Sequence, residues 1–196
     1  MTKKQRNSLI IGGVLFVLIL FFGITYNGLV QKEENVEKAW AQVETVYQRR
    51  ADLVPNLVNT VKGVADYEKE TLEAVMNARA QATATTIDPQ NLTKENFDAF
   101  NQAQSNLSGS INRLLAVVER YPELKATQNF SELQQQLEST ENRISVERQR
   151  YNETVNTYNG NRKKFPTNVV AGIFGFSEKP YYQADAGAEK APEVSF

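Results

Sequence analysis

The feature of this sequence that most constrains its fold is a long uncharged segment near the N-terminus. Residues 7–31 carry no charged side chain, and residues 9–24 are apolar apart from three glycines. A helix needs about 20 predominantly apolar residues to cross the hydrocarbon core of a bilayer. The sequence therefore predicts a short basic segment at residues 1–8 and a transmembrane helix at residues 9–28.

A cleaved signal peptide is the alternative for this segment, because Lys3, Lys4 and Arg6 resemble the basic start of such a peptide. The apolar stretch is longer than the usual signal core of about 7–15 residues, and no A-x-A-like cleavage site follows it. We therefore expect a retained anchor. Its three basic residues precede the span, whereas only Lys32 and Lys38 follow closely. Basic residues mark the cytoplasmic side, which predicts a cytoplasmic N-terminus and an outer domain.

Composition excludes several function classes. The chain has 22 basic and 23 acidic side chains, so it lacks the excess positive charge that nucleic-acid binding needs. It contains neither histidine nor cysteine. General-base catalysis by histidine, thiolate chemistry and metal sites built on imidazole or sulfur are therefore ruled out. We expect no cofactor, no metal and no enzyme activity.

The body of the chain shows the spacing of amphipathic helices, with apolar residues alternately four and three positions apart. Pro55 lies in phase with the first stripe, which predicts a kink near Pro55 rather than a reversal. If unbroken from Gln31 to Ala82, this helix would be about 80 Å long. The first stripe comprises Val36, Trp40, Val43, Tyr47, Arg50, Val54, Leu57, Val61 and Val64.

Two further stripes follow. Thr93 is a plausible N-cap for the first of them, and the last long helix is expected to begin near residues 129–132. Because no helix is apolar all round and the loops are short, the helices should pack against each other in antiparallel fashion. We predict an all-α protein, with an elongated antiparallel bundle of three or four helices over residues 29–166. The stripes are Phe97, Phe100, Gln104, Leu107, Ile111, Leu114, Val118 and Tyr121, then Phe130, Leu133, Leu137, Thr140, Ile144, Tyr151, Val155, Tyr158 and Phe165.

Residues 167–196 form the last region. Its apolar, glycine-containing part, residues 169–176, is too short to span a bilayer. This part either packs on the end of the bundle or contacts the membrane surface or a partner. From Ser177 onward the composition predicts a mobile tail.

Two dense polar clusters are the candidate structural or interaction sites. They comprise Arg49, Arg50 and Asp52, and Glu141, Asn142 and Arg143. One interpretation is an ion-pair network that fixes helix register, and the other is a partner-binding patch. Arg50 occupies a stripe position, so we predict that it pairs with Glu141, or failing that with Glu147. The alternative is that its guanidinium reaches past the stripe into water.

A series of short motifs runs through nearly the whole chain. They are Tyr26–Val30, Ala39–Glu44, Tyr47–Val58, Tyr121–Ala126, Leu137–Ile144, Tyr151-Asn152, Tyr158-Asn159, Phe165-Pro166 and Gly175-Phe176. In these motifs and their order the sequence resembles the LemA family of bacterial membrane proteins. Two departures are minor: residues 64–67 lack a histidine often seen there, and Ser139 replaces a common glycine.

The resemblance implies a single-span protein with an antiparallel helical domain, for which no enzymatic activity is established. Some accounts of the family place the N-terminus outside, so the orientation stays open. We expect a non-enzymatic scaffold or adaptor in the bacterial inner membrane, held by lipid contacts of residues 9–28 and binding protein partners. The alternative is a hydrolase or other enzyme with an unrecognised carboxylate-based site.

Overall fold

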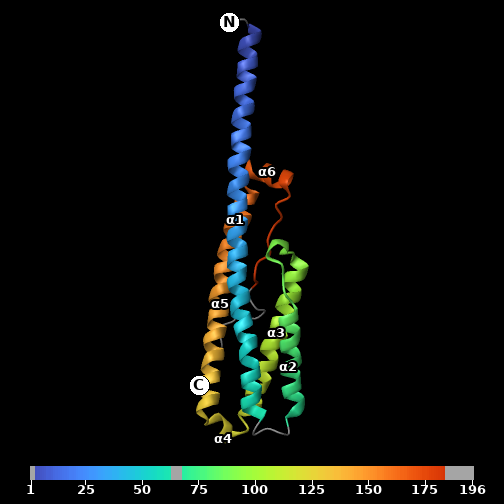
Figure 1. Ribbon diagram of the computed structural model, residues 1–196, viewed down its shortest axis with the longest axis vertical. Coiled ribbons are helices and arrows are strands. Elements are labelled where there is room, and N and C mark those ends of the chain that lie inside the picture. The colour runs from blue at the N-terminus through green and yellow to red at the C-terminus, as the bar shows by residue number, and fades with distance from the viewer. Residues whose placement is uncertain (1–2, 63–67, 184–196) are drawn as a thin grey trace, which may run out of the picture.

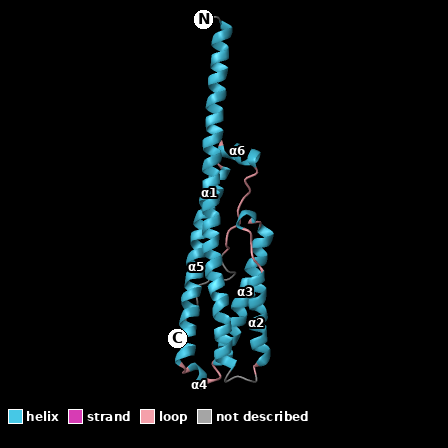
Figure 2. Ribbon diagram, viewed as in Figure 1, coloured by secondary structure: helices cyan, strands magenta, loops and turns pink. Residues whose placement is uncertain are grey.

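A computed structural model describes residues 3–62 and 68–183 (Figure 1). Helices account for all regular structure in these residues, and no strand occurs among them (Figure 2). The all-α prediction is therefore confirmed. The elements are α1 (Lys3–Lys62), α2 (Lys69–Ala84), the 3-10 helix η1 (Pro89–Asn91), α3 (Lys94–Val118), α4 (Pro122–Lys125), α5 (Gln128–Lys163) and α6 (Thr167–Phe174).

Helix α1 continues through Pro55 without reversal, as predicted. The possibility of one helix from Gln31 to Ala82 is wrong, because α1 ends at Lys62 and α2 lies beside it (Figure 1). Gly63 follows α1 in the sequence, and glycine is the residue most often found just past a helix end. Val64, the last member of the predicted stripe, falls outside the described residues.

The long helices lie side by side in a rod, beyond which the N-terminal part of α1 projects alone (Figure 1). Helix α5 packs along α1, and α2 packs chiefly on α3. In Figure 1 the chain descends along α1, rises along α2, descends along α3 and rises again along α5.

The projecting part of α1 is long and apolar enough to cross a membrane, and its most apolar window has no residue buried within the protein. Leu9 to Leu20 are about half exposed or more, whereas Leu29 is fully buried. The same helix therefore changes from an uncovered rod to a packed element between Phe21 and Leu29.

Pro55 leaves one helical carbonyl without its usual donor. Proline has no N–H, so the oxygen of Ala51, four residues earlier, cannot receive the normal helical hydrogen bond. Arg79 of α2 supplies the donor instead, with its Nε 2.8 Å from the Ala51 oxygen. This contact explains how α1 tolerates proline and fixes where α2 lies against it.

The sequence predicted the start of α3 correctly and placed the start of α5 slightly too late. Thr93 caps α3 as predicted, in a capping box with Asn96. Helix α5 begins slightly earlier than expected, because the hydroxyl of Thr127 accepts the Phe130 N–H at 3.4 Å and acts as its N-cap.

The buried side chains of the bundle form two main clusters. The aliphatic cluster fills the end of the bundle far from the N-terminus, and the aromatic cluster fills the other end. The aliphatic cluster comprises Ala51, Leu53, Val54, Leu57, Val58, Val61, Leu72, Val75, Ala82, Leu107, Ile111, Leu114, Val118, Leu124, Phe130 and Leu137. The aromatic cluster comprises Val36, Trp40, Val43, Tyr47, Ile87, Leu92, Phe97, Phe100, Ile144, Tyr151, Val155, Tyr158 and Tyr182.

Candidate functional site

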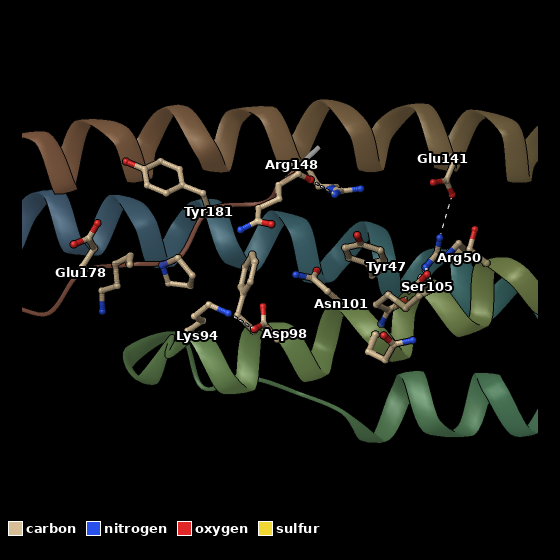
Figure 3. A pocket seen from close by; sticks show the side chains of 17 residues that line it. Tyr47, Arg50, Lys94, Asp98, Asn101, Ser105, Glu141, Arg148, Glu178 and Tyr181 are labelled. Carbon is tan, nitrogen blue, oxygen red and sulfur yellow. Dashed lines mark hydrogen bonds and ion pairs between the residues drawn. The ribbon is translucent and has the colours of Figure 1, made fainter. Parts of the chain in front are cut away.

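A groove of about 880 Å³ opens between α3 and α5, with part of α1 as its floor. Figure 3 shows Tyr47 and Arg50 of α1 between Glu141 of α5 and the α3 residues Asn101 and Ser105. The chain segment that follows α6 enters the groove from one end, and we call residues 176–183 the strap. The other end, towards Arg50, is not occupied by any of residues 3–62 and 68–183.

Arg50 connects three helices at the open end of the groove. It is only 4% exposed. Its Nη1 donates to Glu141 of α5 at 3.1 Å, and its Nη2 donates to the backbone oxygen and the side-chain Oε1 of Gln104 in α3, at 2.9 and 3.0 Å. The predicted Arg50–Glu141 pair is therefore confirmed. A guanidinium with these partners is suited to fixing the register of α1, α3 and α5.

Gln104 is the partner that sequence reasoning missed. Its amide nitrogen also donates to the backbone oxygen of Ala82, near the end of α2, at 3.3 Å. Gln104 is 5% exposed and stands in the middle of an apolar stripe. A polar residue at such a position was the available signal, because buried polar groups require hydrogen-bond partners.

The structure does not bring the other members of the two predicted clusters into this network. Asp52 is turned towards α2, where it lies 3.9 Å from the guanidinium of Arg79. Arg49, Asn142 and Arg143 are exposed on the helix surfaces. The network consists of Arg50, Glu141 and Gln104.

The strap contradicts the mobile tail predicted from Ser177 onward. Lys179 is 2% exposed and Tyr182 is 6% exposed, and Tyr182 belongs to the aromatic cluster. Composition predicted mobility because the segment is short of apolar residues, yet its backbone finds hydrogen-bond partners on α5. The remainder of the predicted tail, residues 184–196, lies outside the described residues.

Two Tyr-Asn pairs, seven residues apart on α5, hold the strap. Asn152 donates to the Tyr182 oxygen and accepts the Tyr182 N–H, both at 2.9 Å. Asn159 makes the same two bonds with Lys179, at 2.8 and 3.1 Å. A spacing of seven residues is two helical turns, so both asparagines face the same side of α5.

The two tyrosines complete this arrangement. Tyr151 donates its hydroxyl to the Pro180 oxygen at 3.0 Å, and Tyr158 donates to the Ser177 oxygen at 2.8 Å. Burial raises the pKa of both hydroxyls above the usual value for tyrosine, so they remain protonated donors. The asparagines and tyrosines of α5 therefore bind the main chain of the strap, and side chains of the strap add further contacts with α5.

Charges anchor the end of the strap nearest α6. The buried ammonium of Lys179 lies 2.8 Å from Glu33 of α1. Glu178 lies 2.7 Å from Lys163 and 3.1 Å from Arg162, both of α5. The hydrogen bond from Lys163 lowers the pKa of the Glu178 carboxyl.

The groove offers little for acid-base chemistry. The carboxylates that line it are Asp98, Glu141 and Glu178. Each is paired with a cation: Asp98 with Lys94 at 2.6 Å, and the other two as given above. Within residues 3–62 and 68–183, no group of three or more carboxylates is placed to hold a metal ion.

Fold and groove define an all-α protein that has an apolar N-terminal helix and whose own residues 176–183 lie along α5. The chain belongs to the LemA family, which it matches over residues 39–196. Magnetosome proteins MamQ 1 and MamQ 2 of Paramagnetospirillum magneticum are each 27% identical to it, over 87% of this chain and 68% of theirs. Protein LemA of Metamycoplasma hominis is 23% identical, over 86% of this chain and 78% of its own.

Proposed function

We propose that this protein is a membrane-anchored, non-enzymatic scaffold or adaptor that binds an extended segment of a partner protein in the groove between α3 and α5. One observation carries the proposal: α5 already holds an extended segment by main-chain hydrogen bonds, and the groove continues beyond the strap. Main-chain recognition gives affinity with little demand on the sequence that is bound.

The open part of the groove has the chemistry for such a ligand. Asn101, Ser105 and Ser108 of α3 present amide and hydroxyl groups that can pair with backbone N–H and C=O groups. Arg148 of α5 already donates to the backbone oxygen of Gln183 at 3.3 Å. A partner segment would make main-chain contacts of the same kind in the part of the groove between Arg148 and Arg50.

The proposal includes a single-pass anchor at residues 9–28 in the bacterial inner membrane, with the N-terminus in the cytoplasm and the remaining helices outside as an antiparallel bundle. Three observations support it: the apolar composition of the span, the lack of any buried residue in its most apolar window, and the basic residues that precede it. A rod that stands on such an anchor would present the groove away from the bilayer.

The rival function is a carboxylate-based hydrolase. General acid-base catalysis by a carboxyl pair requires one member with a raised pKa, close to the other. The groove carboxylates each face a cation instead. This arrangement favours binding over catalysis.

Crosslinking in living cells tests the proposal. A photoreactive amino acid replaces Ser105, which is exposed in the groove, and in a matched strain replaces Gln135, which is exposed on α5 outside it. We expect the probe at Ser105 to capture a defined segment of one partner, identified by mass spectrometry. The probe at Gln135 should not capture that segment.

A second substitution makes the result specific. Asn101→Trp places a bulky side chain in the open part of the groove and should abolish the crosslink from position 105. Capture that persists with Asn101→Trp, or that is equal at positions 105 and 135, would argue against binding in the groove. Turnover of a substrate by the purified protein, abolished by Glu141→Gln, would instead favour the hydrolase.

A further inference from the structure

Helix α6 meets α1 where the predicted span ends. Val170 and Ala171 of α6 are buried and pack on Leu29 of α1. The ring of Tyr26 lies 4.9 Å from that of Phe174 and 5.6 Å from that of Phe176. Figure 1 shows α6 beside α1 at the level where α1 leaves the rest of the domain.

The opposite face of α6 is apolar and uncovered within the described residues. Val169 and Ile173 lie one turn apart, on the side away from Val170 and Ala171, and are 47% and 63% exposed. Phe174 at the end of the helix is 53% exposed, and Phe165 just before it is 83% exposed. A helix that is apolar on nearly all sides is normally covered on all sides.

The position of this face along α1 indicates what covers it. From Leu9 to Tyr26, α1 rises by about 26 Å, which is close to the thickness of the hydrocarbon core. If residues 9–28 cross the bilayer, α6 therefore lies at the level of the headgroups. Lys164, which is exposed just before α6, can then reach anionic lipid phosphates.

We infer that α6 is an interfacial helix, with Phe165, Val169, Ile173 and Phe174 covered by lipid at the membrane surface. The inference rests on the anchor in the proposed function. It adds a second membrane contact, lateral to the span, which sets the depth of α1 in the bilayer. Because α1 continues without a break into the bundle, this contact also sets the angle at which the rod leaves the membrane.

The lack of native cysteine allows a direct test with single spin labels on the full-length protein. Leu15→Cys, Ile173→Cys and Val146→Cys place a nitroxide in the span, on α6 and on α5, at positions that are 54%, 63% and 46% exposed. The protein is reconstituted in vesicles of phosphatidylcholine and phosphatidylglycerol. Collision rates with oxygen, which enters lipid, and with a water-soluble nickel complex are then measured by electron paramagnetic resonance. Fluorescence of the buried Trp40 checks that each variant is folded.

We expect the ratio of oxygen to nickel collisions to be highest at position 15, several-fold lower at position 173, and lowest at position 146. A ratio at 173 equal to that at 146, with a lipid signal at 15, overturns the inference and leaves the anchor intact. A water signal at all three positions means that the anchor in the proposed function fails. Shielding of position 173 from both reagents also overturns the inference, since protein would then cover α6.

Discussion

The two ends of the bundle have different cores. The aliphatic cluster draws its side chains from helices α1 to α5, and most of them are aliphatic. The aromatic cluster also takes side chains from two segments outside the long helices: Ile87 and Leu92 flank η1, and Tyr182 belongs to the strap. Among the described residues, helices alone build the aliphatic end, whereas the aromatic end also requires the strap.

A polar layer separates the two ends. Arg50 stands on α1 between Tyr47 of the aromatic cluster and Ala51 and Val54 of the aliphatic cluster. Its bonds to Gln104 and Glu141 are satisfied only when α1, α3 and α5 are in one register. The comparison indicates that the helices are aligned at this layer and that the strap completes the core on its aromatic side.

The largest effect is expected from Trp40→Ala in the aromatic cluster. Trp40 is fully buried, as predicted, and its ring centroid lies 5.1 Å from that of Phe100 and 6.4 Å from that of Tyr182. We expect a loss of about 3–5 kcal/mol in the free energy of unfolding, the range for large-to-small core substitutions. Urea unfolding in mild detergent, followed by circular dichroism, measures this loss.

Leu57→Ala, at a fully buried site in the aliphatic cluster, is the matched control. Its cost should be about 2–5 kcal/mol. Hydrogen exchange at the Tyr182 amide distinguishes the two ends, because that amide is bonded to Asn152. Under conditions where both variants remain folded, Trp40→Ala should speed this exchange and Leu57→Ala should not. Equal acceleration in both variants would mean that the two ends are one cooperative core.

The next effect concerns Arg79 and Pro55 at the aliphatic end. Arg79→Met leaves the Ala51 carbonyl without a donor and should cost about 1–2 kcal/mol, as for an unsatisfied buried acceptor. Pro55→Ala restores an N–H four residues after Ala51. Arg79→Met should therefore cost less in the Pro55→Ala background, and urea unfolding of the four proteins measures the difference.

Arg113→Met, an exposed substitution on α3, is the control for the loss of one positive charge. It should change the free energy of unfolding by less than about 0.5 kcal/mol. An equal cost for Arg79→Met with and without Pro55 would show that Arg79 acts through Asp52 or through packing, rather than through the Ala51 carbonyl.

A smaller effect is expected for the ion pair in the polar layer. The side chain of Arg50 is buried but that of Glu141 is 53% exposed, so solvent screens the pair. A double-mutant cycle of Arg50→Met and Glu141→Gln should give a coupling of about 0.5–1 kcal/mol, towards the lower end for contacting residues. The same cycle with Glu147→Gln should give none, because Glu147 pairs with Arg150 at 2.8 Å. Additive losses in both cycles would show that Arg50 and Glu141 are not energetically coupled.

The smallest effect is the pH dependence of the strap. The pKa of Glu178 is lowered in the folded protein, so its contribution is complete above the pKa of the unfolded chain. The contribution is lost as the pH falls through the lower, folded pKa, in a window below about pH 4.5. Because the pair is half exposed, we expect only about 0.2–0.5 kcal/mol. Hydrogen exchange at the Lys179 amide, corrected for the intrinsic rate, should rise in this window and do so less in Glu178→Gln. An identical pH response in that variant would assign the change to another group.

The sequence by itself determined most of the buried positions of the long helices. Phe165, the last member of the predicted stripe, is an exception, because α5 ends at Lys163 and Phe165 is 83% exposed beyond it. The four-three spacing identified the stripes of α1, α3 and α5, and Trp40, Leu107 and Ile144 lie in the core as that spacing requires. It also led from Arg50 to Glu141. A charged side chain in an apolar stripe needs a partner, and Glu141 is an acidic residue next to the stripe of α5. Periodicity works here because a helix repeats every 3.6 residues whatever its neighbours are.

Only the tertiary structure decided which stripes face each other and which backbone groups are shared between elements. The bond from Arg79 to the Ala51 carbonyl and the strap on the Tyr-Asn pairs both use backbone atoms as partners. Pro55 marks the Ala51 carbonyl as lacking its helical donor, but nothing in the sequence shows that Arg79 supplies one. Backbone groups recur at almost every residue, so the carbonyls of the strap that the Tyr-Asn pairs bind are not marked by a side-chain pattern either. For this reason composition predicted a mobile segment where the structure has the strap packed on α5. The groove that we propose as the binding site could not be predicted for the same reason.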